Sequence, residues 1–236
     1  MDLAPGVEVA EFAQGGASFR VVTVDLTRAR LDLIGQADGD PREVDALLAA
    51  PPAGFVAATN AGMYHRPDDP VGLFVQDGVE RSPIDLQTGQ PGNFYLAPNA
   101  VFYVDAAGAH VVASTAYAPA GPVRLATQSG PALVLGGAIH PAFDPQSTSK
   151  TVRNAVCASS PSTVRLVLSV EPVRFMDLAL LVRDQLGCAD ALYLDGHISG
   201  MWGPSLPKGP RRFPYAGFLV VTTPAGSEPC CTTSPP

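Results

Sequence analysis

Short apolar segments, bounded by glycine, proline, asparagine or aspartate, recur along almost the whole chain and constrain its fold more than any other feature. The chain has 236 residues, including 23 glycines and 24 prolines, and only 16% of its residues are charged. This composition favours many short strands joined by turns over a helical bundle. A chain of this length can bury one sizeable core, so we expect a single domain over residues 1–223 and a flexible Pro/Thr/Ser tail over residues 224–236.

The pattern predicts an α+β fold, with a curved mixed β-sheet and a few packed helices. The expected strands are Val7–Phe12, Phe19–Leu26, Gly54–Thr59, Gly72–Val75, Phe94–Ala97, Val101–Val104, His110–Ala113, Leu125–Gln128, Val152–Ala158, Val164–Val170, Ala191–Leu194 and Ala216–Val221. Helices are expected over Arg42–Ala50, after the cap pair Asp40-Pro41, and over Val173–Leu186, before the stop residue Gly187. Gln76–Val79 carries the Asp-Gly signal of a tight hairpin.

Charge and hydropathy exclude several classes of function. Lys plus Arg number 15 and Asp plus Glu number 22, which gives a net charge of −7 and argues against a general nucleic-acid binder. No apolar run is long enough to span a bilayer. The first residues lack the basic and apolar segments of an export signal. We expect an exported protein, periplasmic or extracellular, whose signal lies outside this sequence, with a cytoplasmic location as the alternative.

The cysteines and glycines indicate neither a metal nor a cofactor. Cys157 and Cys188 lie in apolar contexts and are expected to be core thiols, while Cys230 and Cys231 fall in the tail. No metal-type Cys-x-x-Cys spacing, Gly-rich dinucleotide fingerprint or phosphate-cradling Gly-Lys-Ser/Thr loop is present in the sequence.

Four polar loops are associated with the expected strands. Each mixes hydrogen-bonding side chains with small residues, a combination that suits binding sites because small residues let the main chain approach a ligand. The loops are Thr59–His65, Thr127–Pro131, Thr151–Val156 and Asp195–Ser199.

The last loop follows the apolar run Leu192–Leu194, which indicates a buried strand. Asp195 is therefore expected at the rim of a sheet, where a carboxylate can act in catalysis. The same pattern also suits a turn aspartate that only bonds its own backbone.

These loops, in this order, resemble the motifs of the phosphodiester glycosidase family over about Phe55 to Val221. The first family motif is Asn-Gly-Gly-Phe-Phe-like and is matched by Asn60–Tyr64, and the next two are Gly-Leu and Asp-Gly, matched by Gly72-Leu73 and Asp77-Gly78. They are followed by Gln-Ser-Gly-Pro, matched by Gln128–Pro131, and by an Arg, matched by Arg153-Asn154. The last motif is Leu-Asp-Gly-Gly-x-Ser, matched by Leu194–Ser199. The sequence departs from the family pattern at Ala61 and at His197-Ile198.

The resemblance implies a hydrolase that cleaves a sugar-1-phosphodiester between the anomeric carbon and the phosphodiester oxygen. That reaction needs a cation for the phosphate and a carboxylate for the oxocarbenium-like centre or the attacking water. Arg153 fits the first role, because a planar guanidinium matches two phosphate oxygens. Asp195 fits the second, as nucleophile or base, and His197 is the candidate for assisting proton transfer.

The remaining candidates would contact sugar hydroxyls or phosphate oxygens: Asn60, Gly62, Gln128, Ser129, Asn154, Gly196 and Ser199. The implied partner is a small-molecule or glycan substrate that carries a phosphodiester, with no cofactor and no metal. The sequence makes no prediction about oligomeric state.

Several of these residue types also have plain structural roles. Arg153 would suit a surface ion pair, Asn60 a left-handed turn, and Gln128 the satisfaction of buried backbone groups. Ser129 and Ser199 are common turn formers, and His197 suits an exposed loop. Trp202 would suit either a sugar-stacking platform or a core anchor.

Two other functions stay open at this stage. One is a non-catalytic envelope module that binds an anionic glycan through the same loops. The other is a metal-dependent phosphodiesterase that uses His65, Asp68 and Asp69, although two prolines beside these acids favour a rigid, solvated loop.

Overall fold

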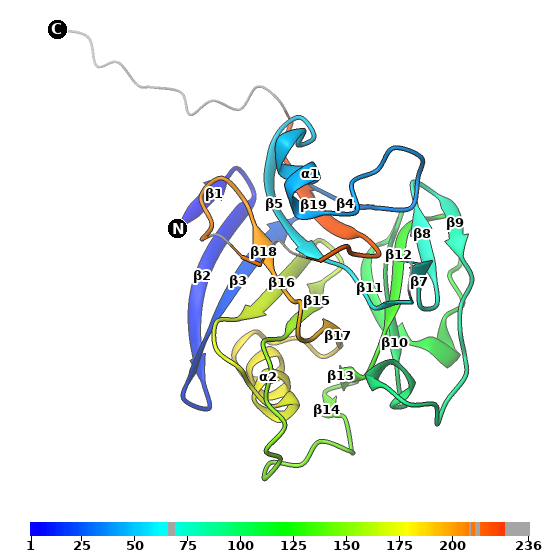
Figure 1. Cartoon of the computed structure of the whole chain (residues 1–236), viewed down its shortest axis with the longest axis vertical. Helices are drawn as coiled ribbons and strands as arrows, with labels where there is room; N and C mark the ends of the chain where they lie inside the picture. Colours follow the sequence, from blue (N-terminus) through cyan, green and yellow to red (C-terminus); the bar gives the residue numbers. More distant parts are fainter. Residues whose placement is uncertain (66–68, 208, 211–212, 225–236) are drawn as a thin grey trace, which may run out of the picture.

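Strands dominate the computed structural model, which describes residues 1–65, 69–207, 209–210 and 213–224 (Figure 1). Strands hold 44% of the chain and helices 11%, so the fold is mostly β rather than a balanced α+β arrangement. Every strand pair in the described part of the chain is antiparallel. The prediction of a mixed sheet was therefore wrong. Tight turns join many neighbouring strands, and such turns connect antiparallel pairs.

The largest sheet has eight strands in the order β1-β2-β3-β16-β15-β17-β13-β14. Their bounds are β1 Asp2–Ala4, β2 Val7–Gln14, β3 Ala17–Asp25, β13 Ala132–Leu135, β14 Ala138–Ile139, β15 Asn154–Ser160, β16 Thr163–Ser169 and β17 Ala191–Asp195. The central strands β15, β16 and β17 are mainly buried, as their runs of Val, Leu, Ala and Cys predict.

Two smaller sheets and one short ribbon complete the β structure. The five-stranded sheet has the order β11-β10-β12-β8-β9, and the four-stranded sheet has the order β18-β5-β19-β4. Their bounds are β4 Arg30–Ile34, β5 Phe55–Asn60, β8 Phe74–Gln76, β9 Val79–Ser82, β10 Ala100–Asp105, β11 Gly108–Ala113, β12 Val123–Ser129, β18 Met201–Trp202 and β19 Phe218–Thr222. The ribbon pairs β6 Tyr64–His65 with β7 Asp69–Pro70.

Both predicted helices are present. The helix α1 (Val44–Ala49) buries Val44 and Leu47, which join Trp202 and Phe218 in a small core beside the four-stranded sheet. The helix α2 (Phe175–Leu180) continues as a π-helical turn η3 (Leu181–Gln185) and lies against the large sheet (Figure 1). Short 3₁₀ turns occur at η1 (Asn93–Tyr95) and η2 (Ser114–Ala116). No helix in the described residues is long and apolar enough to cross a membrane.

The hairpin predicted at Gln76–Val79 is confirmed. Gln76 of β8 pairs with Val79 of β9, and the two residues between them have positive φ angles, 51° at Asp77 and 78° at Gly78. Two positive φ angles define the type I′ turn, whose twist matches that of the flanking strands.

The strand predicted at Phe94–Ala97 is wrong, because the chain forms the turn η1 there. Gly92 precedes the turn with a φ of 109°, and Pro98 follows it and has no N–H to donate to a ladder.

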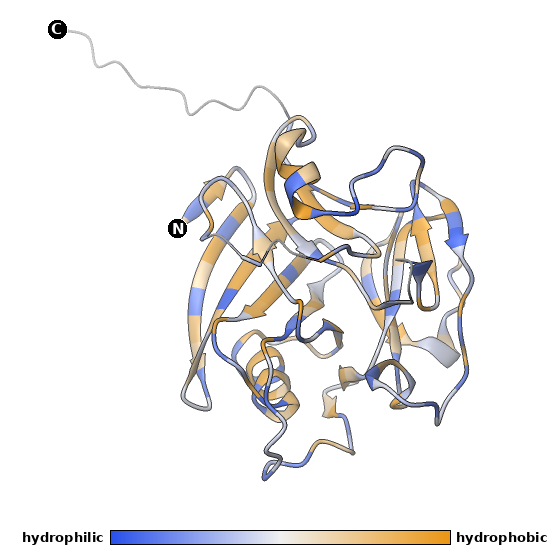
Figure 2. Ribbon diagram, in the orientation of Figure 1, coloured by the Kyte–Doolittle hydropathy of each residue, from blue (hydrophilic) through white to orange (hydrophobic). Residues whose placement is uncertain are grey.

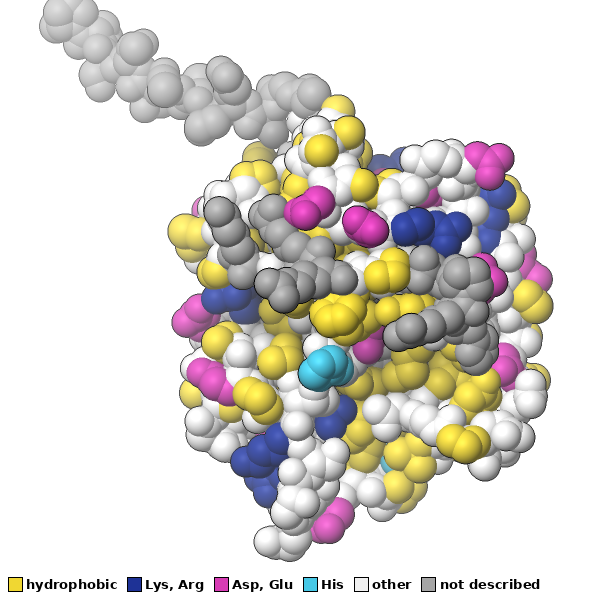
Figure 3. All heavy atoms as spheres, in the orientation of Figure 1, with side chains coloured by type: hydrophobic (Ala, Val, Ile, Leu, Met, Phe, Trp, Pro, Cys, Tyr) yellow, Lys and Arg dark blue, Asp and Glu magenta, His cyan; other side chains and the backbone are white. Residues whose placement is uncertain are grey.

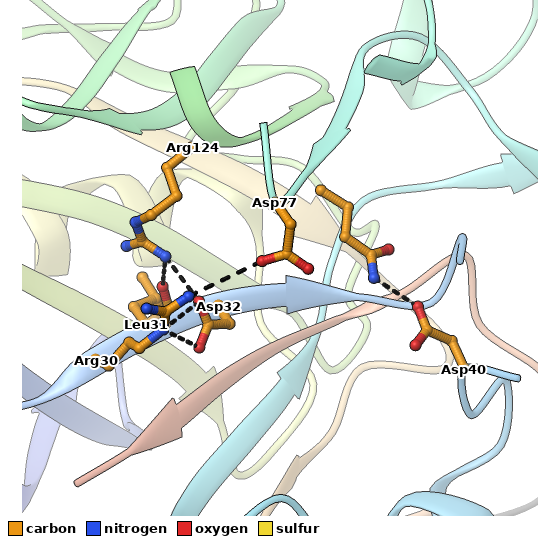
Figure 4. A network of polar contacts seen from close by, with 7 residues as sticks. Arg30, Leu31, Asp32, Asp40, Asp77 and Arg124 are labelled. Atoms are coloured by element: carbon orange, nitrogen blue, oxygen red, sulfur yellow. Dashed lines mark hydrogen bonds and ion pairs between the residues drawn. The ribbon is translucent and has the colours of Figure 1, made fainter. Parts of the chain in front are cut away.

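The strand β4 was not predicted, although its residues alternate between two environments. Leu31 and Leu33 are buried, while Arg30 and Asp32, which alternate with them, belong to an ion-pair network with the neighbouring sheet (Figure 4). Arg124 of β12 donates to Asp32 Oδ1 at 2.7 Å, and Arg30 Nε donates to Asp32 Oδ2 at 2.7 Å. This network ties the four-stranded sheet to the five-stranded sheet.

Hydrophobic residues on the strands and on α2 form the interior, and many connecting loops are more polar (Figure 2). One core cluster joins all three larger sheets and includes Val22, Leu33, Phe102 and Leu192. A second cluster lies where α2 packs on the opposite face of the large sheet, and it includes Phe175 and Tyr193. The sheet that carries the candidate site is therefore buried on both faces.

Cys157 and Cys188 form a disulfide, so the prediction of two free core thiols was wrong. Both residues are fully buried in the second core cluster, and apolar burial alone does not distinguish a thiol from a disulfide. The bond ties β15 to the segment that follows η3. Cys230 and Cys231 lie outside the described residues.

Removing this disulfide is expected to lower the free energy of unfolding by about 3–4 kcal/mol. The estimate comes from the chain entropy released when a loop of this size is opened, with 31 residues of sequence separation. Urea unfolding of a Cys157→Ala/Cys188→Ala variant measures the loss. Adding a reductant should destabilise the parent protein and leave the variant unchanged. Equal stability of the parent and the variant would contradict the expectation.

Candidate active site

Three strands bring the main polar candidates together at their ends. Asn60 ends β5, Asn154 begins β15 and Asp195 ends β17. The strands β15 and β17 are neighbours, and their register aligns Asn154 with Asp195. An irregularity in this pairing follows Asn154, a feature that often redirects side chains beside active sites. Asn60 and Asp195, 135 positions apart in sequence, thus meet where the ends of strands from the four-stranded and eight-stranded sheets come together.

Asn154 is the centre of the hydrogen-bond network at these strand ends. Its Nδ2 group donates to Thr59 Oγ1 at 2.9 Å, to the Asn60 carbonyl at 2.8 Å and to Asn60 Oδ1 at 3.1 Å. Its Oδ1 atom accepts from Ser199 Oγ at 3.1 Å. Asn60 Oδ1 also accepts from the backbone N–H of Gly200 at 3.0 Å. The buried amides of Asn60 and Asn154 therefore fix the loop that follows Asp195.

The carboxylate of Asp195 accepts two hydrogen bonds. Asn60 Nδ2 donates to Oδ2 at 3.2 Å, and the Gly196 backbone N–H donates to Oδ1 at 2.6 Å. These bonds favour the charged form, but burial outweighs them and raises the pKa of Asp195 to about 7. The bond from Asn60 joins two separate strands, so a purely local turn role does not account for the geometry. A residue with this pKa, still partly exposed, can hold or release a proton near neutral pH.

The guanidinium of Arg153 is buried without a counter-charge. The residue is 2% exposed, and the described residues place no carboxylate within ion-pair distance of it. Its Nε group donates to the Val173 carbonyl at 3.0 Å, and its Cζ atom lies 3.6 Å from the centroid of the Phe175 ring. Nη1 is buried and has no hydrogen-bond partner. The surface ion pair that was one interpretation of Arg153 is therefore absent from this part of the structure.

A buried cation without an anion is unfavourable, and burial lowers the pKa of Arg153. Arginine nevertheless stays charged at this depth, because its intrinsic pKa is very high. Nη1 is thus a buried donor that lacks an acceptor among the described residues. Arg153 lies next to Asn154 in sequence and therefore one residue away from the aligned pair Asn154 and Asp195.

The two candidates of the second loop bond to the protein itself. Gln128 Oε1 accepts from the backbone N–H groups of Leu73 and Asp85 at 3.0 and 2.9 Å, and Gln128 Nε2 donates to the Asp85 carbonyl and to Ser114 Oγ. Ser129 Oγ donates to the Leu194 carbonyl at 2.9 Å. Gln128 thus satisfies buried backbone groups, while Ser129 fixes the strand that leads into Asp195.

Both candidate glycines are close-packed. A Cβ atom at Gly62, where φ is 71°, would lie 2.9 Å from Thr127 Oγ1. A Cβ atom at Gly196 would lie 2.5 Å from the Tyr193 hydroxyl. Both positions therefore require glycine.

The structure places His197 at the surface and Trp202 in the core. His197 is exposed on the loop after Asp195. Trp202 is 1% exposed and packs on Tyr215 and Phe218, while its Nε1 group donates to the Pro210 carbonyl at 3.1 Å. Trp202 is thus a core anchor and not a sugar platform.

The alternative metal site involves residues that the structure describes only in part. The described residues contain no cluster of three or more His, Cys, Asp or Glu side chains suited to a metal ion. Asp68, which belonged to that alternative, lies outside the described residues.

Sequence reasoning missed two aromatic residues, Phe175 and Tyr193, which surround Arg153. Alternation along Leu192-Tyr193-Leu194 places Tyr193 on the opposite face from the two leucines, and this was the available signal. In Figure 3, hydrophobic side chains gather in the middle of one face of the molecule, next to a His side chain.

Comparison with known proteins identifies related sequences and folds. A model of the phosphodiester glycosidase family matches residues 53–213. The protein YigE of Escherichia coli (strain K12) is 32% identical over 166 residues, which are 70% of this chain and 64% of that relative. The chain thus spans less than two thirds of the length of this relative.

Two solved structures share the fold. The catalytic domain of zebrafish N-acetylglucosamine-1-phosphodiester alpha-N-acetylglucosaminidase, auto-inhibited by its pro-peptide, superposes with a TM-score of 0.64 and 15% identity. That match covers 94% of this chain and 85% of the other. A Burkholderia pseudomallei K96243 protein described as a putative exported protein gives a TM-score of 0.52 and 16% identity, covering 87% of this chain and 74% of the other.

Proposed function

Since the chain belongs to the phosphodiester glycosidase family, we propose that it hydrolyses a sugar-1-phosphodiester between the anomeric carbon and the phosphodiester oxygen. One observation carries the proposal. A buried guanidinium without a counter-charge lies directly before β15, and a carboxylate with a pKa of about 7 ends the neighbouring strand β17. The guanidinium supplies the charge that a phosphodiester needs, and the carboxylate supplies the nucleophile or base.

The leaving group determines which groups the reaction requires. A phosphate monoester leaves from the anomeric carbon as a weak base, so a dedicated general acid matters less than it does for ordinary glycosides. Arg153 binds the phosphate oxygens through Nη1 and stabilises charge as the C–O bond breaks. Asp195 either attacks the anomeric carbon or removes a proton from the attacking water. His197, on the exposed loop that follows Asp195, is the proposed residue for assisting proton transfer.

The remaining network orients these groups. Asn60 and Asn154 hold the Asp195 carboxylate and the loop after it, and their amides and the Ser199 hydroxyl are proposed to face sugar hydroxyls when substrate is bound. Gly62 and Gly196 are proposed to contact the substrate through their backbone groups. Gln128 and Ser129 are proposed to shape the site through the backbone groups they bond.

Activity is expected to rise with pH through about 7 and then to level off. Burial raises the pKa of Asp195 to about 7, and a nucleophile or base works only in its ionised form, which prevails above that pH. The pH profile of kcat/KM on a sugar-1-phosphodiester measures this in the free enzyme. A profile that falls as pH rises through 7 would show that the protonated form is active.

A panel of purified sugar-1-phosphodiesters, assayed with and without a chelator, tests the proposal. We expect release of the free sugar and of a phosphate monoester, with no loss of activity on chelation. Tight binding of the panel without any turnover would instead support a glycan-binding module. Activity lost on chelation and restored by a divalent cation would support a metal-dependent phosphodiesterase.

We also place this activity outside the cytoplasm. The disulfide between Cys157 and Cys188 supports this placement, because such bonds persist mainly in oxidising compartments. The description of the Burkholderia pseudomallei protein as exported agrees with it.

A further inference from the structure

We infer that the hydroxyl group of Tyr193 is a positioning element that couples the phosphate-binding guanidinium of Arg153 to the loop holding Asp195. This inference rests on the proposed function, because it assigns a substrate phosphate to Arg153. The sequence motifs do not include Tyr193.

The Tyr193 side chain is enclosed on the same face of the large sheet as Arg153. It is 1% exposed, and its ring meets the Phe175 ring edge-on with 4.8 Å between centroids. The Cζ atom of Arg153 lies 5.5 Å from the Tyr193 ring centroid and 3.6 Å from that of Phe175. The two aromatic rings therefore flank the guanidinium, with Phe175 as the closer surface.

The hydroxyl of Tyr193 joins this group to two other segments. Burial raises the pKa of this hydroxyl, and the nearby side chains of Arg153 and Asn93 act against that rise. Asn93 belongs to η1, in a connection that no sequence motif marked. A buried phenol needs such partners, because an unpaired hydroxyl in an apolar environment is costly.

The same hydroxyl lies against the loop that holds the carboxylate. A Cβ atom at Gly196 would be only 2.5 Å from it, so the hydroxyl contacts the backbone of Gly196 directly. The N–H of Gly196 is the group that donates to Asp195 Oδ1. One side chain thus touches both the proposed phosphate ligand and the residue that orients the proposed nucleophile.

This arrangement explains why Nη1 of Arg153 remains free. Nε donates to the Val173 carbonyl, and the Tyr193 side chain lies beside the guanidinium, with 5.5 Å between Cζ and its ring centroid. These two neighbours restrict how the guanidinium plane can turn, and Nη1 stays available to an oxygen of the phosphate. Without the hydroxyl, Arg153 keeps its charge and loses its orientation.

A Tyr193→Phe variant tests the inference, because it keeps the ring and removes only the hydroxyl. We expect a roughly tenfold increase in KM for a sugar-1-phosphodiester and a similar weakening of inorganic phosphate binding, with a smaller change in kcat. Tyr103→Phe is the matched control, since Tyr103 is a buried tyrosine that stacks on His110 in the five-stranded sheet. Tyr103→Phe should leave both the KM and the binding of inorganic phosphate unchanged.

An Arg153→Met background separates positioning from general stability. If Tyr193 acts through Arg153, adding Tyr193→Phe to that background should have no further effect on phosphate binding. Fully additive losses, or phosphate binding by Tyr193→Phe equal to that of the parent, would overturn the inference.

Inorganic phosphate binding also separates this inference from the proposed reaction, because calorimetry of the parent protein needs no turnover. Phosphate binding that depends on Tyr193, together with no hydrolysis of any sugar-1-phosphodiester, would refute the reaction and leave the inference standing. Absence of phosphate binding by the parent protein at millimolar concentration would overturn the inference, even if the sugar substrates were hydrolysed.

Discussion

An Asp195→Asn variant is expected to lose about a thousandfold or more in kcat while remaining folded. The amide cannot act as nucleophile or base, and positioned groups of this kind typically contribute two to four orders of magnitude. Asn60 and the backbone N–H of Gly196 both donate to the carboxylate of Asp195. The asparagine side chain of the variant has a single oxygen, so only one of these two donors keeps its acceptor. Steady-state kinetics on a sugar-1-phosphodiester, with circular dichroism as the check on folding, measure the effect.

The stability of this variant should change in a way that depends on pH. Ionising Asp195 costs stability as pH rises from 3.8 to about 7, because the folded state disfavours the charged form more than the unfolded chain does. The asparagine variant should lack this decline. Asp184→Asn is the matched control, since Asp184 is a half-exposed partner of Arg183 at the molecular surface. Full activity of Asp195→Asn would remove Asp195 from the mechanism.

An Arg153→Met variant is expected to lose about 10²- to 10³-fold in kcat/KM and yet to be no less stable than the parent. The loss follows from removing the donor to the phosphate, an effect of the size seen when a preorganised charge-stabilising group is deleted. Stability is preserved because a buried, unpaired cation is replaced by an apolar side chain that still packs on Phe175. The Val173 carbonyl keeps its hydrogen bond from the Thr151 N–H.

Urea unfolding measures the stability of Arg153→Met, and steady-state kinetics on the same preparation measure its kcat/KM. An Arg20→Met variant is the control, because Arg20 lies on the same sheet and is paired with Glu11 at 3.2 Å. It should leave activity unchanged. A large loss of stability in Arg153→Met with normal kcat/KM would assign Arg153 to the structure alone.

The sequence predicted elements whose signal is local. The apolar runs of β15, β16 and β17 and the Asp-Gly hairpin at Asp77-Gly78 are each determined by a few neighbouring residues. The strand β4 had a usable signal in the alternation of Leu31 and Leu33 with charged residues. By contrast, the turn at Asn93–Tyr95 was missed because its aromatic residues resemble those of a strand, and Gly92 and Pro98 decide the outcome.

Long-range relations were harder to predict. The pairing of Cys157 with Cys188 depends on how α2 and η3 pack on the large sheet, which no local pattern records. The burial of Arg153 against Phe175 depends on the same packing. Motif resemblance named Asn60, Asn154 and Asp195 from three separate segments, but only the packing of two sheets against each other brings their side chains into one hydrogen-bond network.

Hydrolysis of a sugar-1-phosphodiester in ¹⁸O-labelled water tests most directly which bond is broken. Attack at the anomeric carbon, with Asp195 as nucleophile or base and phosphate as leaving group, predicts that the label appears in the released sugar and that the phosphate monoester is unlabelled. Label found in the phosphate would mean that water attacks phosphorus, and it would contradict the assignment of Asp195 and Arg153 to glycosidic cleavage.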